Sequence, residues 1–184
     1  MRQALKLHPD SRCTAATHVE VDVAFPRSGN LVLQYFVSGN MRELRLPPVS
    51  VPMRADELWR HTCFEAFLRA PPAAPYYELN FAPSTHWAAY RFSDYRSGMQ
   101  IARDIDAPRF EVQSDAGSYK LQASLDLDHL TDMPSRAGWR LSLSAVIEEA
   151  DGRKSYWALA HPPGDADFHH IDSFVHELPA ADYS

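Results

Sequence analysis

Short runs in which apolar and polar side chains alternate make up most of the chain. In residues 17–25, apolar side chains occupy every second position from Val19 to Phe25, with polar side chains between most of them. A period of two residues predicts a β-strand that buries one face. The pattern predicts ten or eleven strands, which fall at residues 17–25, 31–37, 42–46, 62–69, 76–82, 87–92, 109–113, 118–126, 139–149, 154–160 and 174–178.

The predicted strands follow one another at intervals of about 8–14 residues, and 14 prolines and 7 glycines separate them. This rhythm is typical of β-sandwiches and barrels. Helical signals are confined to possible single turns at residues 56–60 and 126–130. We therefore expect an all-β fold with little helix, a two-sheet antiparallel β-sandwich of jelly-roll or immunoglobulin-like form. One domain is expected over residues 1–184, with its core at about 17–178.

Two of these strands can be placed in register by arithmetic. Residues 62–69 and 76–82 form a hairpin if Arg69 pairs with Tyr76 across the turn at 70–75. A slip of one residue would mix an apolar face with a polar one, which is costly when one face is buried. The pairing predicts three core pairs, Phe64–Phe81, Ala66–Leu79 and Leu68–Tyr77. On the other face it predicts the pairs Glu65–Asn80 and Phe67–Glu78.

The same reasoning extends the sheet to residues 87–92. Pairing Ala82 with Trp87 puts Glu78 opposite Arg91, and it places Trp87 beside Asn80. Acids, an amide, a guanidinium and aromatic rings suit a sugar, because hydroxyls take polar contacts and ring faces stack on aromatics. A solvated sheet face with the same residues is the alternative. The two registers together gather Glu65, Phe67, Glu78, Asn80, Trp87 and Arg91 on one face.

Residues 57–68 and 76–83 carry a resemblance to a known family. Trp59 is followed after five residues by Glu65 in a strand, and a Tyr-Tyr-Glu strand then ends near Pro83. This pattern resembles DOMON-like domains and family 9 carbohydrate-binding modules, and residues 157–170 look like the closing motif of the bacterial DOMON-like subgroup. The resemblance implies a β-sandwich that binds sugars or haem, with Trp59 and Glu65 in the cleft. Trp87 and Trp157 are candidates for a second stacking ring.

Histidines and aspartates gather in the last quarter of the chain. These residue types ligate Zn²⁺, but their spacing fits no zinc pattern, and adjacent histidines on an extended chain point to opposite faces. We expect the segment to be a long loop held by hydrogen bonds between side chains and backbone, with no metal. We also expect His169 and His170 to form the wall of the cleft opposite Trp59. The full set is His161, Asp165, Asp167, His169, His170, Asp172 and His176.

Haem and catalysis are the two alternatives to sugar binding. The resemblance implies methionine and histidine as haem ligands, which could be Met41 or Met53 with a late histidine, while the absence of a Cys-x-x-Cys-His motif excludes covalent haem. A glycoside-processing enzyme would use paired carboxyl groups, for which Glu65 and Glu78 are the candidates. No other catalytic motif is present in the sequence. We expect no cofactor and no catalytic residue.

Composition narrows the choice of partner. The 184 residues carry a net charge of −6 and no long run of basic residues, so nucleic acid is not an expected partner. No stretch of about 18 apolar residues predicts a membrane span. The sequence contains no pattern typical of a signal peptide, and Cys13 and Cys63 form no disulfide framework, so we expect a cytoplasmic protein. The predicted role is non-catalytic binding of a carbohydrate-like or other small polar ligand, and a protein partner is left open.

Overall fold

Twelve β-strands form the structure, a computed structural model that describes residues 2–27, 29–128, 130 and 138–178. Every strand pairing is antiparallel. The strands are β1 (Gln3–Leu7), β2 (Ala16–Arg27), β3 (Asn30–Gly39), β4 (Cys63–Arg69), β5 (Tyr76–Phe81), β6 (Trp87–Phe92), β7 (Gln100–Ile101), β8 (Arg109–Ser114), β9 (Ser118–Asp126), β10 (Trp139–Glu148), β11 (Lys154–Ala158) and β12 (His176–Leu178).

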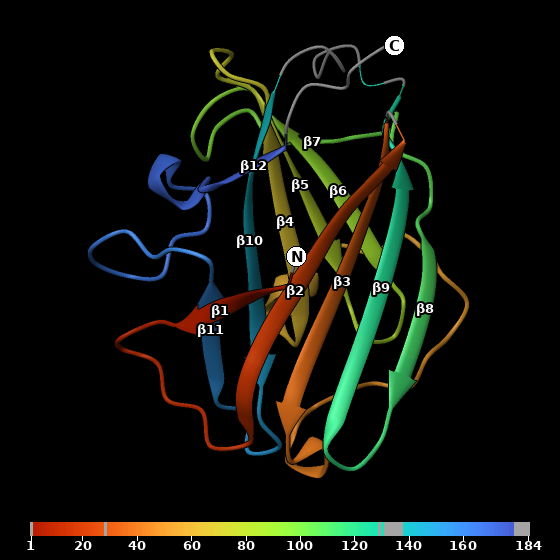
Figure 1. The fold of residues 1–184 in the computed structure, drawn as a ribbon, viewed down its shortest axis with the longest axis vertical. Coiled ribbons are helices and arrows are strands. Elements are labelled where there is room, and N and C mark those ends of the chain that lie inside the picture. The colour runs from red at the N-terminus through yellow and green to blue at the C-terminus, as the bar shows by residue number, and fades with distance from the viewer. Residues whose placement is uncertain (1, 28, 129, 131–137, 179–184) are drawn as a thin grey trace.

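The strands curl into two packed layers (Figure 1). Strands β2, β3, β9 and β8 form the first layer, and β7, β6, β5, β4, β10 and β11 form the second. Strand β1 joins the layers at one side, because it pairs with both β11 and β2, and β12 pairs with β10. The expected all-β sandwich is therefore confirmed.

Aromatic rings from both layers fill the space between them. The Phe64 ring of β4 lies between two rings of the first layer, with centroids 5.0 Å from Tyr35 and 5.9 Å from Tyr119. The buried Tyr35 hydroxyl donates a hydrogen bond of 2.6 Å to the Glu65 carbonyl. This contact satisfies a phenol in a dry core and ties the layers together.

The predicted register of the first hairpin is confirmed. Strands β4 and β5 pair Arg69 with Tyr76, and every other pair follows as expected. The three apolar pairs, which include Phe64 with Phe81, are all buried in the core between the layers. Glu65 and Glu78 therefore face away from that core, on what we call the outer face of the second layer.

The predicted register of the second hairpin is wrong by one residue. Strand β6 pairs Trp87 with Phe81 and Tyr90 with Glu78. The Ala82 carbonyl accepts from Thr85 N at 2.9 Å, Thr85 adopts a left-handed φ of 70°, and Ala82 N donates to the His86 carbonyl. This is a three-residue loop with a bulge, which shifts the pairing relative to the four-residue loop expected.

Helical structure in the described residues is limited to three short 3₁₀ turns, Met41–Glu43, Leu58–Arg60 and Ile171–Ser173. The first replaces the strand predicted at 42–46, because the Asn40 side chain caps the turn at Arg42 N. The second matches the turn expected at 56–60, whereas residue 129 of the other predicted turn lies outside the described residues. No helix within those residues is long and apolar enough to cross a membrane.

Candidate functional site

The outer face of the second layer is covered rather than solvated. Residues 159–175, here called the covering segment, run from β11 towards β12 and place Phe168 and Phe174 against it. These rings pack with Phe67, Tyr90 and other outer-face side chains in a second apolar cluster. Successive side chains of a strand point to opposite faces of the sheet. The same strands therefore contribute every second side chain to this cluster and the others to the main core.

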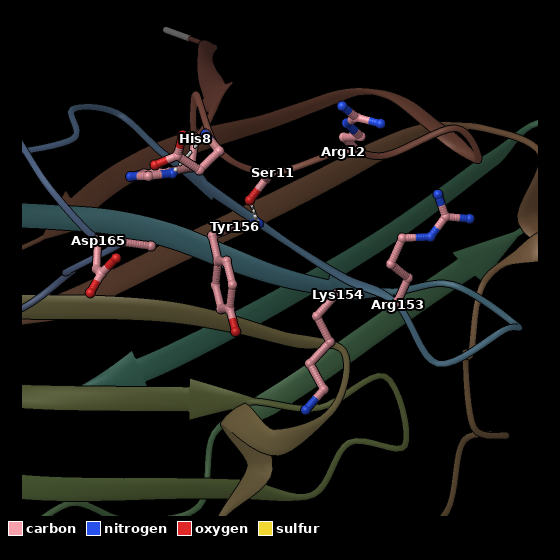
Figure 2. A pocket seen from close by; sticks show the side chains of 9 residues that line it. His8, Ser11, Arg12, Arg153, Lys154, Tyr156 and Asp165 are labelled. Atoms are coloured by element: carbon pink, nitrogen blue, oxygen red, sulfur yellow. Dashed lines mark hydrogen bonds between the residues drawn. The ribbon is translucent and has the colours of Figure 1, made fainter.

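Cavities remain between this face and the segments around it, among them two that share lining residues. The first, the β11 cavity, has a volume of about 570 Å³ and lies beside β11 (Figure 2). The second, the central cavity, has a volume of about 380 Å³ and lies over β4 and β5. Tyr156 and Ala166 line both, so the two cavities adjoin. The central cavity is lined chiefly by Trp59, Glu65, Glu78, Arg96, Tyr156, Phe168 and His169.

Two buried carboxyl groups form the floor of the central cavity. Glu65 is 3% exposed, and its Oε2 accepts a hydrogen bond of 3.4 Å from Ser144 Oγ. Glu78 is 5% exposed, and its Oε1 accepts a hydrogen bond of 2.7 Å from Asn80 Nδ2. Such groups are available to accept hydrogen bonds from a ligand that enters the cavity.

Both carboxyl groups hold their protons more tightly than usual. Burial raises the pKa of Glu65 well above its ordinary value, and the neighbouring Glu78 carboxylate raises it further. Burial also raises the pKa of Glu78 to about 7, although the Asn80 hydrogen bond and the Arg96 charge oppose this. Near neutral pH the pair therefore favours a state that carries less than its full negative charge.

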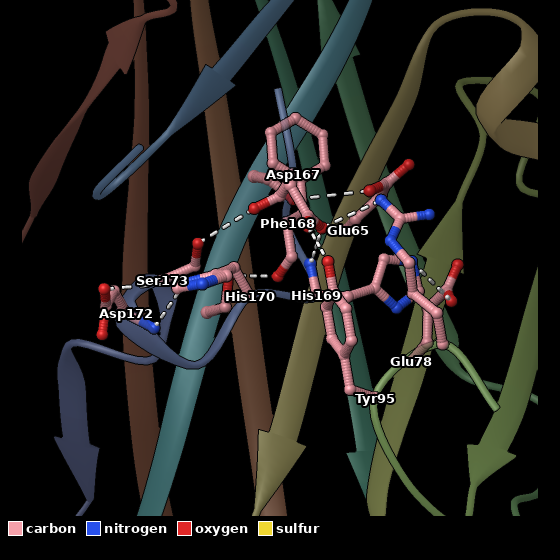
Figure 3. Close-up of polar contacts among 12 residues, drawn as sticks. Glu65, Glu78, Tyr95, Asp167, Phe168, His169, His170, Asp172 and Ser173 are labelled. Carbon is pink, nitrogen blue, oxygen red and sulfur yellow. Dashed lines mark hydrogen bonds and ion pairs between the residues drawn. The ribbon is translucent and has the colours of Figure 1, made fainter. Parts of the chain in front are cut away.

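His169 enters the cavity from the covering segment (Figure 3). Its Nδ1 lies 2.8 Å from the Tyr76 hydroxyl, which also accepts from Arg96 N at 3.2 Å. Because that hydroxyl already accepts from Arg96 N, we assign it as the donor to Nδ1, which puts the proton of the neutral ring on Nε2, 3.8 Å from Glu78 Oε2. Burial, followed by the charge of Arg96, lowers the pKa of His169 to about 4, so the ring is neutral at physiological pH.

Asp167 anchors the covering segment beside the cavity (Figure 3). Its carboxylate lies 2.9 Å from Arg96 Nη2, accepts from the Tyr95 hydroxyl, and accepts from His169 N at 3.0 Å. Burial alone would raise the pKa of Asp167, but the hydrogen bonds from Tyr95 and Arg96 lower it. The carboxylate therefore stays charged. It links the turn that carries Tyr95 and Arg96 to the covering segment that carries His169, and so it fixes two sides of the cavity.

The structure brings together four of the eight residues predicted for the site. Trp59, Glu65, Glu78 and His169 all line the central cavity. Asn80 is fully buried beneath them and orients Glu78 through its hydrogen bond. Trp59 is held at the rim by an edge-on contact with Tyr90, with ring centroids 5.8 Å apart.

The other three predicted residues do not line the central cavity. Trp87 lies in the core between the layers, 5% exposed, with the Arg54 guanidinium 4.0 Å from its ring. Arg91 on β6 is opposite Tyr77 on β5, because the hairpin register is shifted. Both side chains therefore lie on the same side of the sheet, away from the cavity. His170 lines a neighbouring cavity of about 340 Å³, which shares His169 with the central cavity, and its Nδ1 accepts from Asp172 N at 3.2 Å.

Sequence reasoning missed seven of the residues that line the cavity, and three of them, Arg96, Phe168 and Tyr156, show why. Arg96 lies in an irregular turn after β6, where no periodicity marks it. Phe168 lies inside the histidine-rich segment, whose polar composition drew attention away from it. Tyr156 did carry a signal, since Lys154, Tyr156 and Ala158 share one face of a predicted strand, and that face is the outer one.

The late histidines are dispersed rather than clustered. His161 Nε2 bonds the Lys6 carbonyl at 2.8 Å, and His176 Nδ1 bonds Gln3 Nε2 at 2.8 Å. Within the described residues, no group of three or more histidine, cysteine or acidic side chains is placed to hold a metal ion. The His170 cap is local, whereas His161 and His176 tie this part of the chain to residues at its start, Lys6 and Gln3.

The methionines proposed as haem ligands do not lie with the histidine of the cavity. Met41 is buried in the core between the layers. Met53 is 56% exposed and lies beside the start of β6, where its carbonyl accepts from Trp87 N. The central cavity, which His169 lines, is lined by neither. Neither methionine therefore lies beside His169 in this cavity.

No family model and no curated protein matches the sequence, so the resemblance to DOMON-like domains stays a prediction. Solved structures do share the fold. A provisionally assigned carbohydrate-binding protein from Bacteroides uniformis aligns with a TM-score of 0.69 and 12% identity, over 95% of this chain and 84% of that one. A family 9 carbohydrate-binding module from Caldicellulosiruptor kristjanssonii, in complex with cellotriose, aligns with a TM-score of 0.56 and 13% identity, over 100% and 84%. At these identities the likeness extends to the fold alone.

Proposed function

We propose that the protein binds a carbohydrate, without catalysis, in the central cavity. The observation that carries this proposal is the convergence of an aromatic rim, Trp59, with two buried carboxyl groups, Glu65 and Glu78, on one cavity of about 380 Å³. Such a volume lies in the range of small-molecule sites. That a module of similar fold was solved with cellotriose supports the choice of ligand class.

Each wall suits one part of a sugar ring. Glu65 and Glu78 accept hydrogen bonds from hydroxyl groups, while the indole of Trp59 packs against the apolar C–H face of the ring. The neutral His169 offers its Nε2 proton to a ring or hydroxyl oxygen. Because the cavity combines hydrogen-bonding groups with an aromatic ring, it favours a ligand that has both hydroxyl groups and an apolar face.

Calorimetric titration with mono- and disaccharides tests this proposal. Trp59→Ala should weaken binding about tenfold, because it loses the ring that stacks on the sugar. Glu65→Gln should weaken it about tenfold to a hundredfold, because the amide offers one acceptor oxygen where the carboxyl group offers two. Phe36→Ala is the matched aromatic control, since Phe36 contacts Arg2 and Lys120 on the first layer. Absence of binding to every sugar, together with a large fall in the melting temperature of Glu65→Gln, would mean that Glu65 is a structural group.

Glycoside hydrolysis is the second candidate, because Glu65 and Glu78 are neighbouring carboxyl groups with raised pKa values. A hydrolase would use one as the acid and the other as the nucleophile or base. Incubation of the protein with oligosaccharides, followed by assay of reducing ends, separates the two functions. Turnover that Glu78→Gln abolishes would establish an enzyme, and binding without turnover supports the first proposal.

A further inference from the structure

The β11 cavity is the larger of the two adjoining cavities, and basic side chains gather in it (Figure 2). It is bounded by β11 and by the residues that follow β1, where Tyr156 N donates to Ser11 Oγ at 3.2 Å. Its lining includes Arg12, Arg153 and Lys154, with Asp10 and Asp165 as the acids. Three cations in one cavity stand out in a chain whose net charge is −6.

Two of these three cations have no partner among the described residues. Arg153 is engaged, with Nη2 2.6 Å from Asp151 Oδ2 and Nε 3.5 Å from Glu149 Oε2. For Arg12 and Lys154, the described part of the chain supplies no ion pair and no side-chain hydrogen bond. The two are therefore free to bind a negatively charged group from outside the protein.

The cross-strand neighbour of Lys154 is already neutralised elsewhere. Lys154 on β11 pairs in register with Glu148 on β10. Glu148 instead bonds His61 Nδ1 at 2.7 Å and lies 3.2 Å from Arg45 Nη1. The Glu148 carboxylate is therefore paired with Arg45 and His61. Lys154 consequently lacks the ion pair with Glu148 that their positions on neighbouring strands would otherwise allow.

Lys154 is oriented towards the central cavity. It lies two residues from Tyr156 on β11, so both side chains emerge on the outer face, and Figure 2 shows them extending in the same direction. Tyr156 lines both cavities, whereas Asp165 lies towards the far end of the β11 cavity in this view. A group attached to a sugar in the central cavity would thus pass Tyr156 and meet Lys154.

We propose that the saccharide carries a negatively charged substituent, a phosphate or a carboxylate, which binds in the β11 cavity at Lys154, the cation that extends alongside Tyr156 (Figure 2). This inference rests on the proposed function and narrows its ligand class to acidic sugars. A phosphate or carboxylate oxygen accepts charge-assisted hydrogen bonds from the Lys154 ammonium, and these are stronger than bonds between neutral groups. Neutral sugars should bind in the central cavity alone, and more weakly.

Calorimetric titration of matched sugars tests the inference. The probes are glucose, galactose and mannose, each with its 6-phosphate and its uronate, and inorganic phosphate alone. At low salt an acidic sugar should bind at least about tenfold more tightly than its neutral parent, and the difference should shrink as salt rises. Lys154→Gln should remove most of this difference, whereas Arg12→Gln, which removes a cation on the opposite side of β11, should leave most of it. Lys120→Gln, a lysine on β9 of the other layer, should leave it unchanged.

The outcomes separate this inference from the proposed function. Equal binding of neutral and acidic sugars would overturn the inference and leave sugar binding intact. Binding of inorganic phosphate with no preference for an acidic sugar would also overturn it, since the anion site would then be unconnected with the sugar. Binding of none of the sugars would reject both. A preference for an acidic sugar that Lys154→Gln removes, and Lys120→Gln does not, would support both.

Discussion

Replacement of Glu78 by glutamine should stabilise the protein, and by an amount that grows with pH. The pKa of Glu78 is raised to about 7, chiefly by burial, from an ordinary value of 4.5. Between these values the folded protein keeps a proton that the unfolded chain has released. The wild type therefore loses stability as pH rises through this interval, and a neutral glutamine does not.

The magnitude follows from the width of that interval. At about 1.4 kcal/mol per pH unit, the rise from pH 4.5 to about 7 costs the wild type about 3 kcal/mol. Glutamine keeps an oxygen that can accept the Asn80 bond, so the substitution removes the charge with little loss of contact. The stability gain of Glu78→Gln should thus increase by up to about 3 kcal/mol between pH 4.5 and 7.5.

Urea unfolding of both proteins at half-unit pH steps measures this difference. The charged and titratable groups that act on Glu78 are Glu65, His169 and Arg96. The low pKa of His169, about 4, gives a slope of opposite sign, but it occurs in both proteins and cancels. Removing Glu78 also relieves Glu65, whose raised pKa depends partly on that charge, and this adds to the gain.

Glu111→Gln provides the control, because Glu111 is exposed on β8 in the other layer and should show no such trend. A difference between Glu78→Gln and wild type that stays constant from pH 4.5 to 7.5 would refute the reasoning. So would a difference of opposite sign. Either result would mean that Glu78 is ionised in the folded protein, and that the floor of the cavity is better solvated than its burial indicates.

Two further predictions concern packing. Phe64→Ala should reduce the free energy of unfolding by about 3–5 kcal/mol in urea titrations, because the ring is fully buried and packs on Tyr35 and Tyr119. A loss below about 1 kcal/mol would contradict that packing. Trp87→Ala should likewise reduce the free energy of unfolding by about 3–5 kcal/mol and leave sugar affinity unchanged, because the observed register buries this ring away from the cavity. A stable variant with impaired sugar binding would favour the register first predicted.

The first hairpin could be predicted because its two faces differ. On β4 and β5 one face is apolar throughout, while the other carries Glu65, Glu78 and Asn80, so a slip of one residue would bury charge in the main core. Every register shifted by an odd number of residues carries that cost. The sequence therefore contained enough information to place both carboxyl groups on the outer face.

The second hairpin could not be predicted in this way, because β5 and β6 are buried on both faces. With apolar side chains such as Ala88, Ala89 and Tyr90 in succession, a shift of one residue leaves little trace in the pattern. The left-handed turn at Thr85 decides the register instead. Threonine is not a residue type that marks such a conformation.

The covering segment shows a second limit. Its anchor joins Asp167 to Tyr95 and Arg96, residues about 70 positions earlier in the chain, and such a contact has no local signature. The histidines were conspicuous in composition, yet only His169 enters the central cavity. What places it there is the aromatic surroundings supplied by Phe67, Tyr76 and Phe92, which a sequence pattern alone does not connect with a distant loop.

The indole N–H signals of the four tryptophans give the most direct test of sugar binding in the central cavity. Three of the rings, Trp87, Trp139 and Trp157, are buried in the core between the layers, and only Trp59 lines the central cavity. In ¹⁵N-labelled protein, titration with a sugar that binds should shift the Trp59 signal in a saturable manner and leave the other three in place. Saturable binding with an unmoved Trp59 signal would contradict the account.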